Sequence, residues 1–336
     1  MQIAKLKQRS QLLRTVRQFF YDHDFLEVET PLLASEVIPE QHIEPSRVAT
    51  QRKENQSQLK TPLALRGNAA TSYLQASPEL HMKRLVAAGM GKIFQITRSF
   101  RAGERGPLHN PEFTILEWYR VGDDMRAGMG LLDELCQTTL KTHSAQRTSY
   151  ATAFQRYANI CPHTATVQEL ADCAKKLNLT VPADRKKADR DEWLNLLLAL
   201  QIEPQLGREG PEILYDYPAS QAALAKVVTR EDGKRVAERF ELYYQGVELA
   251  NGYHELTDAA ELKSRLEEVN RLREIDDRQT LPMPESLLSA MEAGLPACAG
   301  CALGFDRLVM LALGAKSIRE VSIGEVSTEE VNDELA

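Results

Sequence analysis

Two arginines far apart in the chain could bind a nucleotide. Arg101 ends an alternating run and is followed by a loop and then by Phe113, an aromatic residue on the returning run. A guanidinium can bridge two anions through its planar set of donors, whereas a lysine offers a point charge. Arg101 therefore suits an α-phosphate together with a substrate carboxylate, and Phe113 could stack on a purine. If Arg101 and Phe113 were an isolated pair, a salt-bridged arginine and a core phenylalanine would be the favoured interpretation. The surrounding sequence over 98–119 is too specific for that structural interpretation.

The second arginine, Arg307, lies in the first turn of a predicted apolar helix. The helix dipole makes a cation there unfavourable unless an anion is bound, and a γ-phosphate would supply one. Gly304 allows the backbone to approach a ligand closely. Common phosphate motifs are absent, because Val86 stands where a P-loop needs its first glycine and Phe94 where a dinucleotide fingerprint needs its third.

A pair of carboxylates on a predicted hairpin could hold a metal ion. The hairpin covers residues 240–250, with a two-residue turn at 245–246. Counted from the turn, Tyr243 pairs with Glu248 and Glu241 pairs with Ala250, so Glu241 and Glu248 are diagonal neighbours on one face. Two carboxylates that face a polyphosphate suit Mg²⁺. On these residues alone, an exposed acidic face is an equal alternative.

The elements that position these residues can be predicted from alternation. A hairpin with a long loop runs from Ile93 to Tyr119. Arg101 leaves its first strand on the polar face, with Gln95, Thr97 and Ser99. On the returning strand the residues that align are Phe113, Ile115, Glu117 and Tyr119, so Phe113 and Tyr119 can line the same pocket. Asn251 and Glu255 can share the carboxylate face if a bulge forms near Gly252.

The rest of the chain supplies a helix over 6–23, an alternating strand over 25–31 and a helix that begins after Ser77 and Pro78. Residues 51–60 predict a mobile loop. Residues 131–206 are mainly helical in pattern and indicate an insertion into a sheet that resumes at residue 213. The C-terminal helix starts near Asp306 and stops at Gly314.

The composition further limits the number of domains and the classes of protein to which the chain can belong. The 336 residues, 43% of them hydrophobic, suffice for one large or two smaller domains. No apolar run suits a membrane span or a signal peptide, so we expect a cytoplasmic protein. The net charge of −7 argues weakly against a broad nucleic-acid footprint. Cys298 and Cys301 form a CxxC without a partner at zinc spacing, which favours simple packing.

These segments resemble the catalytic core of class II aminoacyl-tRNA synthetases, and most closely its lysyl branch. Residues 25–31 match the first motif, 101–113 the second and 304–307 the third. The resemblance implies an α+β fold, an antiparallel sheet flanked by helices, in a single catalytic domain over 1–336 that carries the mainly helical insertion. It also implies a homodimer.

The resemblance implies roles for individual residues. Arg101 and Arg307 are the expected catalytic residues, and Glu241 and Glu248 the Mg²⁺ ligands. ATP binding is expected at Arg101, Gly103, Glu104, His109, Asn110, Phe113, Glu248, Leu249, Gly304 and Arg307. Gly103 stands where the second motif usually has glutamate, so either Glu104 or the backbone near Gly103 contacts adenine. The expected substrate-binding residues are Ser77, Pro78, Glu79, Tyr119, Asn251, Glu255 and Ala302, with Glu79 at the amino group and Tyr119, Asn251 and Glu255 around a side-chain ammonium.

The first motif begins so early that no anticodon-binding domain fits before it. This layout is similar to that of the elongation factor P–(R)-β-lysine ligases, a truncated family of the lysyl branch. The resemblance implies ATP-dependent activation of (R)-β-lysine or lysine to an aminoacyl-adenylate, and amide formation with a lysine ε-amino group of elongation factor P. Stable tRNA binding is not expected. The alternatives are anticodon-independent aminoacylation of tRNA, an amino-acid–ammonia ligase and a non-catalytic amino-acid-binding regulatory paralogue.

Overall fold

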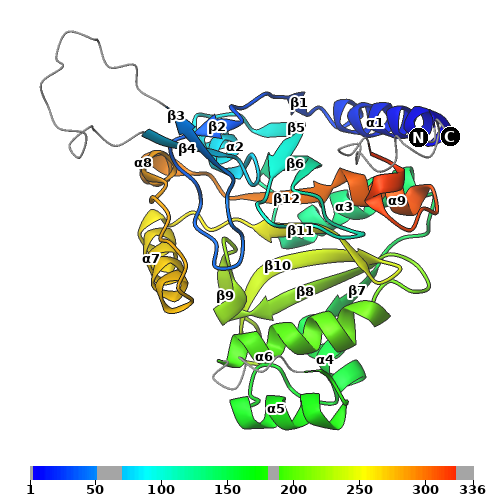
Figure 1. Cartoon of the computed structure of the whole chain (residues 1–336), viewed down its shortest axis with the longest axis vertical. Coiled ribbons are helices and arrows are strands. Elements are labelled where there is room, and N and C mark those ends of the chain that lie inside the picture. The colour runs from blue at the N-terminus through cyan, green and yellow to red at the C-terminus, as the bar shows by residue number, and fades with distance from the viewer. Residues whose placement is uncertain (1–2, 51–69, 181–188, 323–336) are drawn as a thin grey trace, which may run out of the picture.

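The computed structural model describes residues 3–50, 70–180 and 189–322. A nine-stranded sheet forms the centre, in the order β1-β5-β6-β12-β11-β10-β8-β7, and β9 pairs with β10 (Figure 1). Only the outer pairs β1–β5 and β7–β8 are parallel. The strands are β1 Leu26–Glu27, β5 Lys92–Phe100, β6 Glu112–Val121, β7 Gln146–Ser149, β8 Glu212–Pro218, β9 Val227–Thr229, β10 Arg235–Tyr244, β11 Val247–His254 and β12 Cys298–Gly304. The predicted antiparallel sheet is confirmed.

A second sheet of three short strands lies beside it, in the order β2-β4-β3. Its strands are β2 Leu33–Ala34, β3 Arg47–Thr50 and β4 Ala70–Leu74. The irregular segment 35–46 connects β2 to β3. The mobile loop predicted at 51–60 lies outside the described residues.

Helices pack around the large sheet in three groups, each with its own apolar cluster. Phe20, Leu132 and Phe305 bring α1, α3 and α9 against one face of the sheet. A second cluster joins α2, α7 and α8, and a third joins α4, α5 and α6 to β8 (Figure 1). The helices are α1 Ile3–Asp22, α2 Glu79–Ala87, α3 Met125–Leu140, α4 Tyr150–Ala158, α5 Val167–Lys176, α6 Arg190–Leu197, α7 Ala259–Ile275, α8 Glu285–Gly294 and α9 Phe305–Ala312, with a π-helical turn at Leu198–Ile202 and short 3₁₀ turns at Glu203–Gln205, Ala219–Gln221 and Ile318–Glu320.

Most of the predicted elements form where alternation placed them. The hairpin expected from Ile93 to Tyr119 forms between β5 and β6, which pair from Lys92 and Arg120 at the open end to Phe100 and Glu112 at the loop. The strand expected over 25–31 is reduced to two residues at the sheet edge. The range 131–206 divides into three parts: α3 belongs to the main core, β7 joins the sheet, and the helices that follow pack below β8.

The β10–β11 hairpin departs from the predicted register. Its turn, Gln245-Gly246, has two positive φ angles, as a two-residue hairpin requires. Tyr243 pairs with Glu248 as expected, but Glu241 pairs with Asn251 and not with Ala250. A β-bulge causes this shift, because Leu249 has no partner between the pairs Tyr243–Glu248 and Leu242–Ala250. The bulge therefore lies at Leu249 and not near Gly252.

Candidate functional site

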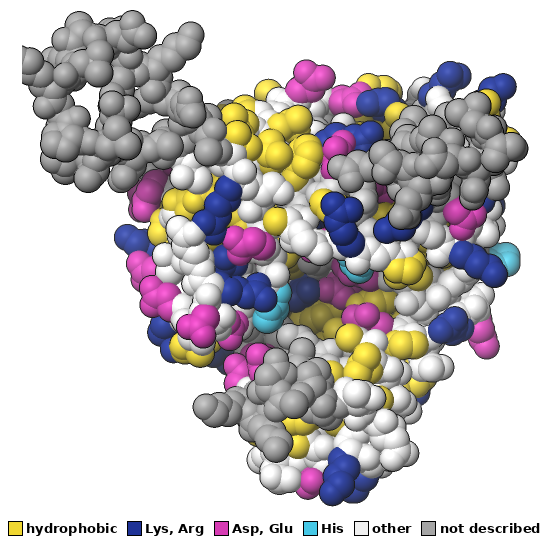
Figure 2. Space-filling view, in the orientation of Figure 1, with side chains coloured by type: hydrophobic (Ala, Val, Ile, Leu, Met, Phe, Trp, Pro, Cys, Tyr) yellow, Lys and Arg dark blue, Asp and Glu magenta, His cyan; other side chains and the backbone are white. Residues whose placement is uncertain are grey.

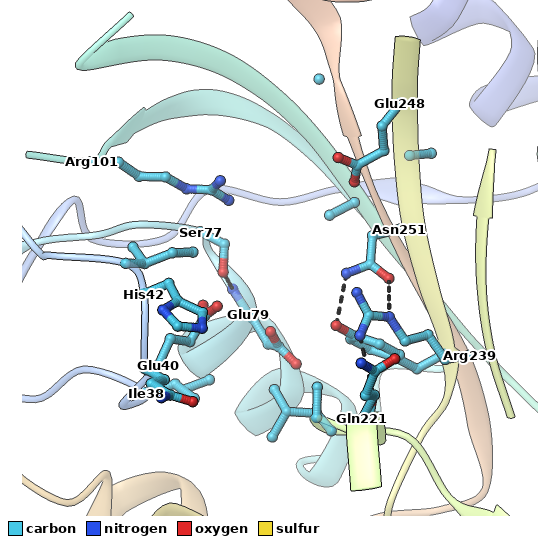
Figure 3. Close-up of a pocket in the computed structure, with 18 of the residues that line it drawn as sticks. Ile38, Glu40, His42, Ser77, Glu79, Arg101, Gln221, Arg239, Glu248 and Asn251 are labelled. Carbon is cyan, nitrogen blue, oxygen red and sulfur yellow. Dashed lines mark hydrogen bonds between the residues drawn. The ribbon is translucent and has the colours of Figure 1, made fainter. Parts of the chain in front are cut away.

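A central cavity of about 780 Å³ opens beside the large sheet. Its walls come from β6, β11 and β12, the start of α2, the segment 38–43 and the loop that follows Arg101. Figure 2 shows the corresponding hollow, with acidic side chains inside it and basic side chains and a histidine near its rim. Figure 3 shows Arg101 reaching into it across from Glu248. Its size and mixed lining suit a small-molecule site.

The Arg101 guanidinium is held for an anion at one side of the cavity. It lies 5.1 Å from the ring centre of Phe113, and Nη1 is 3.8 Å from Glu104. Its Nε is buried and has no hydrogen-bond partner within the described residues. A buried donor without an acceptor is costly. A phosphate or carboxylate oxygen at this position would satisfy it.

Arg307 is fixed from three sides in the first turn of α9. Its Nη1 donates to the Glu248 carbonyl (2.9 Å) and its Nε to the Leu108 carbonyl (3.2 Å). Its Nη2 lies 2.7 Å from Nε2 of His109. Burial and the nearby Arg307 charge lower the pKa of His109, so the neutral ring can accept this bond. A guanidinium held in this way is preorganised for polyphosphate.

The opposite end of the cavity is acidic and closed. Lys83 is 2% exposed and lies 2.6 Å from both Glu79 and Glu255. Glu117, which is 1% exposed, accepts a hydrogen bond from the Tyr119 hydroxyl at 2.7 Å. Its second oxygen, Oε2, has no hydrogen-bond partner within the described residues. We call these five residues the acidic end.

The acidic end contains three carboxyl groups and a single lysine. Burial would lower the pKa of Lys83, but Glu255 and Glu79 outweigh it and hold that pKa above its usual value. Burial raises the pKa of Glu255 to about 7, against the opposing charge of Lys83. Burial and the charge of Glu79 hold the pKa of Glu117 well above its usual range. One ammonium therefore faces three carboxylates, and an additional cation would relieve this imbalance.

Small residues of β12 make room for this end. Gly300, Ala302 and Gly304 alternate along the strand, and all three line the cavity. A Cβ atom at Gly300 would collide with Glu255 and with the Tyr119 ring. At Gly304 it would meet only ordinary contacts with Arg307. Ala302 pairs with Glu117 on one side and Asn251 on the other.

The two expected metal ligands differ in their surroundings. Glu248 lines the cavity, with its side chain 38% exposed, 3.4 Å from Arg307. Glu241 is buried, and its Oε2 accepts bonds from the hydroxyls of Tyr217 and Tyr243, both at 2.5 Å. Desolvation within the cavity, and then the charge of Glu241 on the neighbouring strand, raises the pKa of Glu248.

These two carboxylates fit a metal ion that is also bound by substrate. Oε1 of Glu241 accepts from Arg239, and a carboxylate oxygen has more than one lone pair, so it keeps capacity for a cation. The described residues hold no group of three or more His, Cys, Asp or Glu side chains arranged for a metal. Mg²⁺ here would therefore need phosphate oxygens or water to complete its shell.

The structure brings most of the predicted site residues to this one cavity. Three do not line it. Pro78 instead caps α2 beside Ser77, whose hydroxyl accepts from the Glu79 amide at 3.4 Å. Gly103 forms a turn with φ of +80°, and Glu241 lies behind the wall. The residues found at the cavity are Ser77, Glu79, Arg101, Glu104, His109, Asn110, Phe113, Tyr119, Glu248, Leu249, Asn251, Glu255, Ala302, Gly304 and Arg307.

Four relevant residues were not predicted from the sequence. Alternation placed Glu117 on the strand face of Phe113 and Tyr119, but no role in ligand binding was predicted for it. Lys83 lies one helical turn after Glu79, a spacing at which helical side chains meet. Arg239 donates to Asn251 Oδ1 at 3.3 Å from the neighbouring strand. Glu40 belongs to an irregular segment, where no periodicity marks it.

The buried cysteines have no assigned chemistry. Burial raises the pKa of both the Cys298 and the Cys301 thiol, and neither forms a disulfide. This agrees with the packing interpretation of the CxxC.

No helix in the described ranges is long and apolar enough to cross a bilayer.

An antiparallel sheet with one arginine directly after β5, in the loop of the β5–β6 hairpin, and another in the first turn of α9, after β12, defines a class II synthetase core. The family model for class II tRNA synthetases (D, K and N) matches residues 2–323, and the chain belongs to this family. Membership implies the use of ATP.

Individual relatives narrow the comparison. The chain is 46% identical over 319 residues to the elongation factor P–(R)-β-lysine ligase of Edwardsiella ictaluri (strain 93-146), which covers 95% of this chain and 94% of that protein. Ligases of the same name from Salmonella paratyphi B (strain ATCC BAA-1250 / SPB7) and Salmonella agona (strain SL483) are 46% identical over 321 residues, with the same coverage. The predicted resemblance is confirmed.

Proposed function

We propose that this protein activates (R)-β-lysine with ATP and ligates it to a lysine ε-amino group of elongation factor P. The names of the relatives support both the amino acid and the acceptor. The structural observation that carries the proposal is the acidic end, where two buried carboxylates, Glu117 and Glu255, and the partly buried Glu79 lie around a single lysine. A substrate with two ammonium groups matches this charge.

The substrate can be placed by charge alone. One ammonium would bind between Glu117, Tyr119 and Glu255, where Glu117 Oε2 lacks a partner. The other would bind Glu79, at the start of α2, and the carboxylate would turn toward Arg101 and the nucleotide. Asn251 and Ala302 line the path between them. A neutral or acidic amino acid would leave the acidic end uncompensated.

Adenylate formation would then use the two arginines. The substrate carboxylate attacks the α-phosphorus in line, and pyrophosphate leaves. Arg101 would stabilise the charge at the α-phosphate, and Arg307 the charge on the departing phosphates. Mg²⁺ held by Glu248 and Glu241 would neutralise phosphate oxygens. Positioning supplies most of the catalysis, so no covalent enzyme intermediate is needed.

The acceptor can be tested directly by mass spectrometry. Purified protein is incubated with elongation factor P, ATP, Mg²⁺ and either β-lysine or α-lysine, with lysine tRNA in a parallel reaction. We expect elongation factor P to gain one lysyl group, preferentially from (R)-β-lysine. Efficient charging of the tRNA, with elongation factor P left at its original mass, would contradict the proposal. A regulatory paralogue would fail even to exchange pyrophosphate into ATP.

A further inference from the structure

The segment between β2 and β3 forms a wall of the central cavity that the proposed function does not yet use. Residues 38–43 line the cavity in succession although they form no helix or strand. Figure 3 shows Ile38, Glu40 and His42 of this segment on the same side of the cavity as Ser77 and Glu79. Across from them lie Arg239 and Asn251, on the strands of the large sheet. The side chains of residues 38–43 that line the cavity therefore face the groups that would react there.

A buried arginine holds this segment in place. Arg273 of α7 has no exposed surface. It donates to the carbonyls of Glu40 (2.8 Å) and Ile43 (3.1 Å) and pairs with the Glu44 carboxylate at 2.6 Å. A guanidinium is buried at high cost unless its donors are satisfied, so the backbone of residues 40–44 is strongly constrained.

The other end of the segment is attached to the ATP side. The Ala102 amide donates to the Glu44 carbonyl at 2.8 Å, and Pro45 forms a bridge with Arg101. The segment therefore has a fixed position relative to Arg101. This gives the Glu40 side chain a defined place in the cavity although it belongs to a loop.

Glu40 lines the cavity on the same side as Arg101 and Glu79 (Figure 3). The charges that act on its carboxylate most strongly are those of Arg101 and Glu79, followed by Arg239 and Glu104. Arg101 would contact the α-phosphate and Glu79 the amino group, so Glu40 faces the region where the acyl carbon of an adenylate would lie. The side chain is exposed to the cavity. Within the described residues, no hydrogen bond or ion pair involves its carboxylate.

Glu117 lies in the acidic end, where the substrate ammonium would bind, and the other carboxylates near this region are already paired. Glu79 and Glu255 share Lys83, and Glu248 pairs with Arg307. Glu104 lies 3.8 Å from Arg101. Glu40 is thus the carboxylate best placed to take up a proton without breaking an ion pair of the described chain.

The transfer step requires such a group. A lysine ε-amine has a pKa near 10.4 and is an ammonium at neutral pH, so it cannot attack a carbonyl until it loses a proton. We propose that Glu40 is the general base of the transfer step and accepts this proton from the acceptor ammonium. The inference rests on the proposed function, because it assumes that the acceptor is an amine.

The step balances as follows. The ammonium gives one proton to the Glu40 carboxylate, and the nitrogen lone pair forms the C–N bond at the acyl carbon. The C–O bond to the α-phosphate breaks, and its electron pair leaves with AMP. The second nitrogen proton leaves with the AMP phosphate or to water. Desolvation within the cavity raises the pKa of Glu40, which brings it closer to that of the amine and favours the proton transfer.

The experiment separates activation from transfer. Glu40→Gln removes the basic oxygen and keeps the shape, whereas Glu40→Asp keeps the carboxylate. Glu268→Gln is the matched control, because Glu268 also lines the cavity but pairs with Arg271 on α7. Each variant is assayed for β-lysine-dependent pyrophosphate exchange, for modification of elongation factor P, and for hydroxamate formation with hydroxylamine, a nucleophile that is uncharged at neutral pH.

We expect Glu40→Gln to retain exchange and hydroxamate formation within about threefold and to lose about 100-fold or more in transfer to elongation factor P, in the range of general-base contributions. The loss of transfer activity in Glu40→Gln should become smaller as the pH approaches the pKa of the free amine. Glu40→Asp should be partly active, and Glu268→Gln should match the wild type.

Two results would overturn the assignment. Equal losses in all three assays would make Glu40 a substrate-binding residue, and normal transfer by Glu40→Gln would give it no part in the step. A wild-type enzyme that makes hydroxamate but never modifies elongation factor P would instead refute the acceptor itself, and with it this role for Glu40. That result is visible before any variant is tested.

Discussion

At the scale of single residues, the site consists of groups that lack a partner until substrate arrives. Arg101 Nε and Glu117 Oε2 are both buried without a hydrogen bond in the described chain, one at each end of the cavity. A donor and an acceptor left unsatisfied in this way predict an anion at the first and a cation at the second. Loss of either group should therefore affect ligand binding more than folding.

Arg101→Ala tests the anion side. We expect β-lysine-dependent pyrophosphate exchange to fall by about 100-fold or more, the scale of one preorganised transition-state donor. Arg98→Ala is the control, because Arg98 belongs to the same strand but is half-exposed and pairs with Glu112. Equal exchange rates in the two variants would contradict the assignment of Arg101.

The acidic end should make substrate binding depend on pH. The pKa of Glu255 is raised to about 7 by burial, next to Lys83, Glu79, Glu117 and Tyr119. Binding of an ammonium requires the ionised carboxylate, so protons compete with substrate as the pH falls through 7. We expect the KM for β-lysine to rise between pH 8 and pH 6, and Glu255→Gln to have a high KM that changes little. A wild-type KM that is constant over this range would argue against this role.

The raised pKa of Glu255 also makes the free energy of unfolding depend on pH. The raised pKa means that the folded protein binds this proton more tightly than the unfolded chain does. The contribution of Glu255 to the free energy of unfolding is therefore present below the usual pKa of 4.5 and is lost as the pH rises to about 7. Added β-lysine should consequently raise Tm more at pH 8 than at pH 6, measured by calorimetry.

At the scale of elements, β12 decides how much space the substrate has. Gly300 lies against Tyr119 and Glu255, where a Cβ atom would collide with both. We expect Gly300→Ala to lose most amino-acid-dependent exchange while ATP still stabilises the protein in thermal unfolding. Gly130→Ala in α3 is the control, because an added Cβ there meets nothing within 4 Å. Normal exchange by Gly300→Ala would show that the acidic end does not hold the substrate.

Ala302 offers a finer test on the same strand. Its methyl group lies between Glu117 and Asn251 and could crowd an α-amino group more than one on the next carbon. A single methyl group typically changes discrimination by about 1–3 kcal/mol. Ala302→Gly should therefore shift the ratio of α-lysine to β-lysine activation by tenfold or more, measured by exchange. An unchanged ratio would mean that residues other than Ala302 set the preference between the two lysine isomers.

Elements also show what the sequence could predict. Alternation placed the hairpin from Ile93 to Tyr119 correctly, because its two strands alternate without interruption and pair without a register shift. It failed at Glu241, because a bulge is decided by packing between strands and leaves no mark in the pattern. Glu40 could not have been found, since its place depends on Arg273, which lies far away in the chain.

At the scale of the whole molecule, one edge of the large sheet remains exposed. β1 ends the sheet, and α1 lies beside it (Figure 1). Leu26 is 55% exposed and Leu33 44%, and Tyr21 and Leu32 are also exposed nearby in the chain. Exposed apolar residues that gather near an open strand edge favour association. We therefore propose that this region forms the interface of a homodimer.

Light scattering can check this proposal. Leu33→Asp should shift the protein from dimer to monomer at micromolar concentration, because a charge would be buried at the interface. Leu200→Asp is the control, because Leu200 is 46% exposed but lies in the helices below β8. A wild-type protein that is monomeric at all concentrations, or a dimer unaffected by Leu33→Asp, would exclude this interface.

The bulge at Leu249 has a consequence for how the chain tolerates insertions and deletions. It separates Glu248, on the phosphate side, from Asn251, on the amino-acid side, and lets both reach the cavity. Replacing Leu249 by another apolar residue should change little. Deleting it would leave Glu248 and Asn251 two residues apart, so a regular strand without the bulge would still direct both side chains into the cavity. A protein of this family that has lost this one residue would therefore keep both its sheet and its two ligands.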